Sequence, residues 1–270
     1  MERLRARAKQ LGIDLSDRQL DMFNTYYEML IETNKVMNLT AITEIDEVIT
    51  KHFIDSVSLV KAYPVLLDYQ GFDNNNNNDD TEVISDDLLL KNNKSNTEDY
   101  GKTIKVLDLG TGAGFPGIPL KIVFPKLQLV LMDSLNKRVK FLQSVIDELG
   151  LTGIEAVHGR AEEMARQKNY REQFDLCVSR AVANLSTLGE YCIPFVNVGG
   201  KFISYKSADI DEELNNADNA IKTLGGKLTA VNKLTLPDSD IERAFVIIDK
   251  VKKTSKTYPR KAGTASKSPL

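Results

Sequence analysis

The first residues that could do chemistry are four glycines that follow an apolar run. Residues 104–109 are mostly apolar and predict a buried strand, and residues 118–124 resume with apolar side chains at helical spacing. The glycines between them are Gly110, Gly112, Gly114 and Gly117. A strand, a glycine loop and a helix in this order bring backbone close to the ribose or phosphate of a ligand. We therefore expect Gly110, Gly112 and Gly114 to lie against a nucleoside cofactor.

Asp133 supplies the second chemical group of this site. It follows the apolar run 127–132, which predicts another buried strand. A carboxylate about 20 residues after a glycine loop accepts hydrogen bonds from both hydroxyls of a ribose. The glycine loop and Asp133 therefore converge on one nucleoside.

The elements that position these groups alternate between strands and helices. The predicted strands are 104–109, 127–132, 154–157, 174–179 and 201–205, and residues 137–149 predict an amphipathic helix. Such alternation indicates an α/β domain with a parallel sheet. Residues 227–236 and 243–250 predict two adjacent strands, a hairpin at the edge of the sheet. This order favours a Rossmann-like class I methyltransferase sheet with an antiparallel edge strand over an all-parallel dinucleotide fold.

Composition divides the chain into four parts. Residues 70–101 include an unbroken asparagine run and are too polar to offset their ordering entropy, so they predict a disordered insertion. Apolar residues at helical spacing follow a capping box at Ser16 and Gln19 and predict a helical start of the chain. The predicted parts are a small helical N-terminal region at 1–69, the insertion at 70–101, a methyltransferase domain at 102–250 and a basic tail at 251–270.

The charge distribution and the cysteine content indicate which partners and which cellular compartment to expect. The net charge is −3, yet residues 250–270 hold seven basic residues and no acid, and Arg3, Arg5 and Arg7 lie near the N-terminus. Basic ends indicate contact with a polyanion, although a solvated tail has the same pattern. The chain has two cysteines and no long uncharged apolar run. We therefore expect a reduced cytoplasmic protein with no membrane span, signal peptide or metal site.

Several motifs together resemble a known family. The segment 108–120 reads DLGTGAGFPGIPL, and shorter matches are NLT at 38–40, HFIDS at 52–56, MDS at 132–134, RAEE at 160–163, SRA at 179–181 and YPRKAG at 258–263. This combination is similar to the bacterial glucose-inhibited division protein B family. The resemblance implies an S-adenosylmethionine-dependent enzyme that methylates N7 of a guanine in small-subunit ribosomal RNA. It covers nearly the whole chain except 70–101.

The resemblance also implies which residues touch the cofactor. The family's S-adenosylmethionine contacts fall on Gly110, Phe115, Ala161, Glu162 and Arg180. Asp133 fits the ribose role predicted above, and Ala161 with Glu162 would lie near the adenine. Glu162 is alternatively a carboxylate that a helix dipole favours in its first turn. Arg180 follows the strand 174–179 and is suited to the methionine carboxylate, to an RNA phosphate or to an ion pair.

The implied chemistry needs no general base. Guanine N7 is an acceptor with an available lone pair, so its methylation removes no proton from the base. The enzyme must place N7 behind the methyl group, which is catalysis by proximity and orientation. We therefore predict no catalytic acid or base, and we expect packing or hydrogen-bonding roles for His52 and His158.

Basic side chains would hold the RNA. The candidates are Arg138, Lys206, Arg260 and Lys261, with Arg3, Arg5 and Arg7 beside them. The partner is small-subunit ribosomal RNA or the ribosomal subunit, and we expect a monomer. Two alternatives remain: an RNA-binding or ribosome-assembly factor that has lost the cofactor, and a nicotinamide-dependent dehydrogenase. The dehydrogenase motif fits poorly because Phe115 stands where its third glycine belongs.

Overall fold

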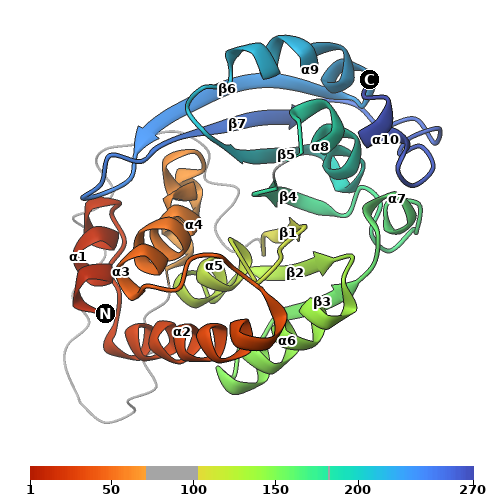
Figure 1. Cartoon of the computed structure of the whole chain (residues 1–270). Coiled ribbons are helices and arrows are strands. Elements are labelled where there is room, and N and C mark those ends of the chain that lie inside the picture. The colour runs from red at the N-terminus through yellow and green to blue at the C-terminus, as the bar shows by residue number, and fades with distance from the viewer. Residues whose placement is uncertain (71–102, 182) are drawn as a thin grey trace, which may run out of the picture.

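A mixed sheet forms the centre of the molecule (Figure 1). The structure is a computed structural model that describes residues 1–70, 103–181 and 183–270. In this part of the chain seven strands pair in the order β3-β2-β1-β4-β5-β7-β6. Their bounds are β1 Lys105–Leu109, β2 Gln128–Asp133, β3 Ile154–His158, β4 Phe174–Ser179, β5 Val196–Lys206, β6 Gly226–Thr235 and β7 Glu242–Lys250.

The predicted α/β sheet and its edge hairpin are confirmed. Strands β1 to β5 run parallel, and β7 pairs antiparallel with both β5 and β6. Strand β5 begins at Val196, five residues before the predicted start. The early residues escape the apolar pattern because Gly199 and Gly200 interrupt it. The structure therefore has the parallel strands whose carboxyl ends share one edge.

Helices cover both faces of the sheet because successive strand residues point to opposite faces. The face with α5 (Gly117–Val123) and α6 (Asn136–Glu148) also carries the helical N-terminal region. The other face carries α8 (Leu185–Cys192) and α9 (Asp211–Thr223). The short helices α7 (Ala161–Met164) and α10 (Thr264–Lys267) lie near α8 (Figure 1).

The N-terminal region is helical, as predicted, and its longest element is α2 (Asp17–Met37), which follows α1 (Glu2–Gln10). The capping box is present: the Ser16 side chain accepts from Gln19 N–H, and the Gln19 side chain accepts from Ser16 N–H. The next helical stretch changes pitch along its length. Its parts are α3 (Ile45–Val48), a π-helix at Ile49–Ile54, α4 (Asp55–Val57) and 3₁₀ turns at Ser58–Lys61 and Pro64–Tyr69.

Of the predicted parts of the chain, the structure describes the C-terminal tail but not the insertion. The predicted insertion at 70–101 lies outside the described residues apart from Gln70. Residues 251–270 are described throughout, and they pack beside α7 and α8 (Figure 1). Among the described helices, none is both long and apolar enough to cross a bilayer. The other predicted boundaries between the four parts stay predictions.

Candidate functional site

The carboxyl ends of four neighbouring strands form one edge, and their loops are tied to one another. Gly110 N–H donates to Met132 O over 2.9 Å, which joins the end of β1 to the end of β2. Gly159 N–H donates to Asp133 O over 3.1 Å and joins β3 to the same place. On the other side, the Ser179 hydroxyl donates to Leu109 O over 2.9 Å. Open α/β sheets bind ligands in the crevice at this edge.

The glycine loop needs its glycines for two different physical reasons. Gly110, Gly112 and Gly114 have φ values of +73°, +62° and +105°, a region that other residues avoid. A Cβ on Gly112 would meet nothing within 4 Å, so the loop is open to a ligand there. A Cβ on Gly114 would instead lie 2.8 Å from the Tyr26 hydroxyl oxygen. Gly114 therefore lets α2 approach the loop, whereas Gly112 leaves space above it.

Asp133 lies where the sequence predicts it, at the end of β2. Its Oδ1 accepts from Leu135 N–H at 2.8 Å, and its Oδ2 accepts from Gly112 N–H at 3.0 Å. Arg138 approaches Oδ2 at 3.4 Å. These donors hold the carboxylate beside the open part of the glycine loop.

A second carboxylate, Asp108, lies inside β1 beneath the loop. Its Oδ2 accepts from the Thr111 hydroxyl at 2.6 Å and from Gly117 N–H at 2.8 Å. Its Oδ1 is buried and has no hydrogen-bond partner among the described residues. Burial raises the pKa of Asp108 to about 7, because a charged carboxylate is poorly solvated there. Asp108 is the first residue of the motif 108–120, and no local sequence pattern predicts a separate role for it.

Aromatic rings connect the glycine loop to the N-terminal region. The His52 and Phe115 rings stack with centroids 4.4 Å apart, and the Arg180 guanidinium lies 5.2 Å from the Phe115 centroid. Thr40 Oγ1 lies 2.8 Å from His52 Nε2. Burial and the neighbouring Arg180 charge lower the pKa of His52 to about 4. His52 is therefore neutral at pH 7 and has packing and hydrogen-bonding roles, as predicted.

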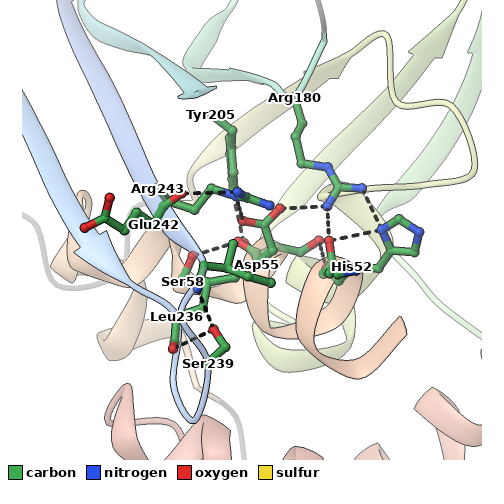
Figure 2. Close-up of polar contacts among 12 residues, drawn as sticks. His52, Asp55, Ser58, Arg180, Tyr205, Leu236, Ser239, Glu242 and Arg243 are labelled. Atoms are coloured by element: carbon green, nitrogen blue, oxygen red, sulfur yellow. Dashed lines mark hydrogen bonds and ion pairs between the residues drawn. The ribbon is translucent and has the colours of Figure 1, made fainter. Parts of the chain in front are cut away.

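Two arginines from distant strands meet at one buried carboxylate (Figure 2). Asp55, only 2% exposed, accepts from Arg180 through Oδ2 at 2.9 Å and from Arg243 through Oδ1 at 2.8 Å. Arg180 also donates to Lys51 O at 2.9 Å and lies 3.2 Å from His52 Nδ1. We call His52, Asp55, Arg180 and Arg243 the arginine cluster. It ties the N-terminal helices to the ends of β4 and β7.

Ala161 and Glu162 begin α7, directly after β3, and both are partly exposed. Glu162 Oε1 accepts from Gly263 N–H at 3.0 Å. The carboxylate therefore has a specific partner in the C-terminal segment. Glu162 lies in the first turn of α7, and its contact with adenine stays a prediction.

The predicted RNA contacts fall into two groups. Three of them already have partners: Arg138 contacts Asp133, Lys206 pairs with Glu213 at 2.6 Å, and Arg260 pairs with Glu190 at 2.6 Å. Lys261 is exposed. Near the N-terminus, Arg3 pairs with Asp46, Arg5 with Asp17 and Arg7 with Asp238. Contact of these side chains with RNA stays a prediction.

The sequence did not assign roles to Asp55 or Arg243. Asp55 follows His52 by three residues, so a shared helical face could have paired them. Arg243 is the second residue of the hairpin strand β7, and none of its neighbours in sequence points to Asp55. Within the described residues, no group of three or more His, Cys, Asp and Glu side chains could hold a metal ion.

The strand order, the glycine loop and the carboxylate at the end of β2 define a class. They are the features of Rossmann-like S-adenosylmethionine-dependent methyltransferases. The crystal structure of MtNAS in complex with MTA and tNA has this fold, with a TM-score of 0.50 and 13% identity. The alignment covers 87% of this chain and 74% of that chain.

Sequence comparison identifies the family within this class. The model of rRNA small subunit methyltransferase G matches residues 19–66 and 82–263. Ribosomal RNA small subunit methyltransferase G of Lachnoclostridium phytofermentans is 48% identical over 97% of this chain and 94% of its own length. The protein of the same name from Alkaliphilus metalliredigens is 45% identical over 97% and 95%. The chain belongs to the rRNA small subunit methyltransferase G family.

Family membership confirms the resemblance drawn from the motifs. The chain is an enzyme, an S-adenosylmethionine-dependent methyltransferase of small-subunit ribosomal RNA. The nicotinamide-dependent dehydrogenase is therefore excluded.

Proposed function

We propose that the enzyme methylates N7 of a guanine in small-subunit ribosomal RNA and that it does so by positioning alone. The observation that carries the cofactor site is Asp133, held by Gly112 N–H and Leu135 N–H beside the open glycine loop. A buried carboxylate with this placement fits the two hydroxyls of a ribose. The donor set of the edge therefore suits S-adenosylmethionine.

Each residue of the edge has a role in this proposal. Asp133 holds the ribose, Gly110 and Gly112 allow backbone to approach the nucleoside, and Ala161 with Glu162 lies at the adenine. Phe115 is buried beside His52 and Arg180 and would border the bound cofactor. Gly114 leaves room for the Tyr26 hydroxyl, which donates to Ala113 O at 2.5 Å and supports the loop. The bound cofactor supplies a methyl group activated by its sulfonium.

The acceptor site lies on the side of the arginine cluster in this proposal. His52 is neutral and both of its ring nitrogens have neighbours within hydrogen-bond distance, so it is placed for packing and not for proton removal. Guanine N7 needs no proton removal because its lone pair is free. Arg180 is ordered by Asp55 and donates toward the methionine carboxylate or an RNA phosphate. Proximity and orientation then supply the catalysis.

RNA binding in this proposal uses basic side chains around the edge. Lys261 is exposed, Arg138 and Lys206 would exchange or share their present carboxylate partners with phosphate, and Arg260 would contact phosphate while it keeps Glu190. Phosphate contacts of this kind give affinity that falls with salt. We further propose that the enzyme acts as a monomer in the cytoplasm.

The experiment is transfer of labelled methyl from S-adenosylmethionine to small-subunit ribosomal RNA that lacks its native modification, followed by nucleoside analysis. We expect label in 7-methylguanosine. Asp133→Ala should lower the transfer by on the order of a hundredfold, since two hydrogen bonds to a charged group are lost. Asp147→Ala, on the outer part of α6, is the matched control and should transfer normally.

The other outcomes separate the alternatives. Label in a different nucleoside would keep the cofactor site and refute methylation without a base. Failure of the wild-type chain to bind S-adenosylmethionine would refute the proposed cofactor site. Equal transfer by Asp133→Ala and the wild type would refute the ribose role of Asp133.

A further inference from the structure

The C-terminal segment, residues 251–270, is anchored to the domain at its first half. Arg171 donates to the backbone oxygens of Thr254 at 2.8 Å, Ser255 at 3.1 Å and Tyr258 at 3.0 Å. Thr254 N–H donates to Glu172 Oε1 at 2.9 Å. One arginine thus gathers three carbonyls of the segment. The basic composition of the segment does not predict these contacts, because its backbone groups make them and its charged side chains do not.

A buried ion pair fixes the segment again before it reaches α7. Glu190, 1% exposed on α8, accepts from Arg260 N–H at 2.7 Å and from the Arg260 guanidinium through both carboxylate oxygens. The Thr187 hydroxyl donates to Ala265 O at 3.1 Å. A bidentate ion pair fixes the relative orientation of the two side chains and also strengthens their interaction. Gly263, which lies between Arg260 and Ala265, is therefore held in place from both sides.

Gly263 then meets the residue expected at the adenine. Its N–H donates to Glu162 Oε1 at 3.0 Å, and its φ of +78° directs the backbone into this contact. A Cβ on Gly263 would meet nothing within 4 Å, so the position requires glycine for its backbone conformation and not for space. One oxygen of Glu162 is fixed by the contact, and the orientation of the other follows from it.

We infer that the C-terminal segment completes the cofactor site: Gly263 N–H orients the Glu162 carboxylate so that Oε2 accepts from the 6-amino group of adenine. Gly263 and Arg260 are positioning residues, and the inference rests on the proposed cofactor site. A carboxylate that reads an amino group rejects a base that carries an oxygen there, because two acceptors then face each other unpaired. The segment thereby contributes to the selectivity of the site for adenine and not only to the stability of the fold.

The test compares two ligands of the full-length protein by calorimetry. The first is S-adenosylhomocysteine, and the second is its deaminated form, in which hypoxanthine replaces adenine. The wild type should bind the first at least about tenfold more tightly, the size expected when a charge-assisted hydrogen bond is lost. Gly263→Ala should weaken the first ligand by roughly tenfold and reduce the preference to about twofold, because the strained backbone releases Glu162.

Matched variants separate positioning from folding. Gly150→Ala changes another glycine, with φ of +60° and no neighbour within 4 Å of an added Cβ, beyond the far end of α6, and should keep both affinities. Arg260→Lys keeps the charge opposite Glu190 but loses the fork, and should reduce the preference by about threefold. This variant tests the inference even where Gly263→Ala does not fold.

The outcomes that overturn the inference are distinct. A preference unchanged in both Gly263→Ala and Arg260→Lys would show that the segment does not orient Glu162. A wild type that binds both ligands equally would show that Glu162 does not read the amino group. A wild type that binds neither ligand would overturn the cofactor site itself, and with it the proposed function.

Discussion

The two halves of the candidate site are built in opposite ways. The proposed cofactor edge, made of the glycine loop at 110–117 and Asp133, consists of backbone N–H donors and one carboxylate, all within residues 110–135. The arginine cluster joins side chains from residues 52, 55, 180 and 243, and the ion pairs of Asp55 with Arg180 and Arg243 hold it together. Local backbone geometry makes the first half and long-range electrostatics makes the second. The difference predicts that the two halves fail differently when they are changed.

Asp55→Asn is expected to have the largest effect. The change leaves the Arg180 and Arg243 guanidinium groups without their shared carboxylate, and breaking a buried pair costs about 3–5 kcal/mol. Urea unfolding measures the loss. Methyl transfer should fall in step, since Arg180 then loses its orientation over Phe115.

Asp46→Asn is the matched control for this change. Asp46 also pairs with an arginine of the N-terminal region, Arg3, but its side chain is 52% exposed where that of Asp55 is 2% exposed. Exposed pairs contribute about 1 kcal/mol or less. Equal losses in the two variants would mean that burial does not set the strength of the Asp55 contacts.

The pH dependence of stability should have opposite signs for Asp108, which lies beneath the glycine loop, and for His52, which belongs to the arginine cluster. Asp108 keeps its proton up to about pH 7 in the folded state and releases it near pH 4 when unfolded, so its contribution is lost as pH rises between these values. His52 takes up a proton near pH 6.5 when unfolded but only near pH 4 when folded, so its contribution is lost as pH falls. Asp108→Asn should remove the loss of stability with rising pH, and His52→Gln should remove the loss with falling pH.

Unfolding free energies at pH 4 and pH 8 measure both trends. Relative to the wild type, Asp108→Asn should gain on the order of 3 kcal/mol between pH 4 and pH 8, since each pKa unit corresponds to about 1.4 kcal/mol. His52→Gln should gain in the opposite direction, from pH 8 to pH 4. If the difference in unfolding free energy between each variant and the wild type does not change with pH, burial does not shift the pKa of Asp108 or of His52.

The same contrast explains what the sequence could predict. The strands from β1 to β4, the edge hairpin and the placement of Asp133 follow from apolar periodicity and glycine spacing, which are local signals. Arg243 and Asp55 are 188 residues apart, and only the pairing of β5 with β7 and the packing of the π-helix bring them together. The basic composition at 251–270 indicated a polyanion contact, yet Arg260 pairs with Glu190 and Gly263 contacts Glu162. No local pattern encodes those partners.

The smallest expected effects distinguish two glycines within the cofactor edge. Gly112 and Gly117 both donate their N–H to a carboxylate, Asp133 and Asp108 respectively. A Cβ on Gly117 would lie 2.2 Å from Leu131 Cδ2, so Gly117→Ala should lose about 1–3 kcal/mol of stability through overpacking. Gly112 has open space but a φ of +62°, so Gly112→Ala should lose about 1 kcal/mol by strain.

Cofactor binding then shows which glycine faces the ligand. Gly112→Ala puts a methyl group into the open space beside Asp133, so S-adenosylmethionine affinity should fall by more than the loss of stability predicts. Gly117→Ala should lower stability first and leave the affinity of the folded fraction within about threefold. Calorimetric titration below the melting temperature of each variant measures this. The reverse order would place the ligand beneath the loop, beside Asp108, and would exchange the roles of the two carboxylates.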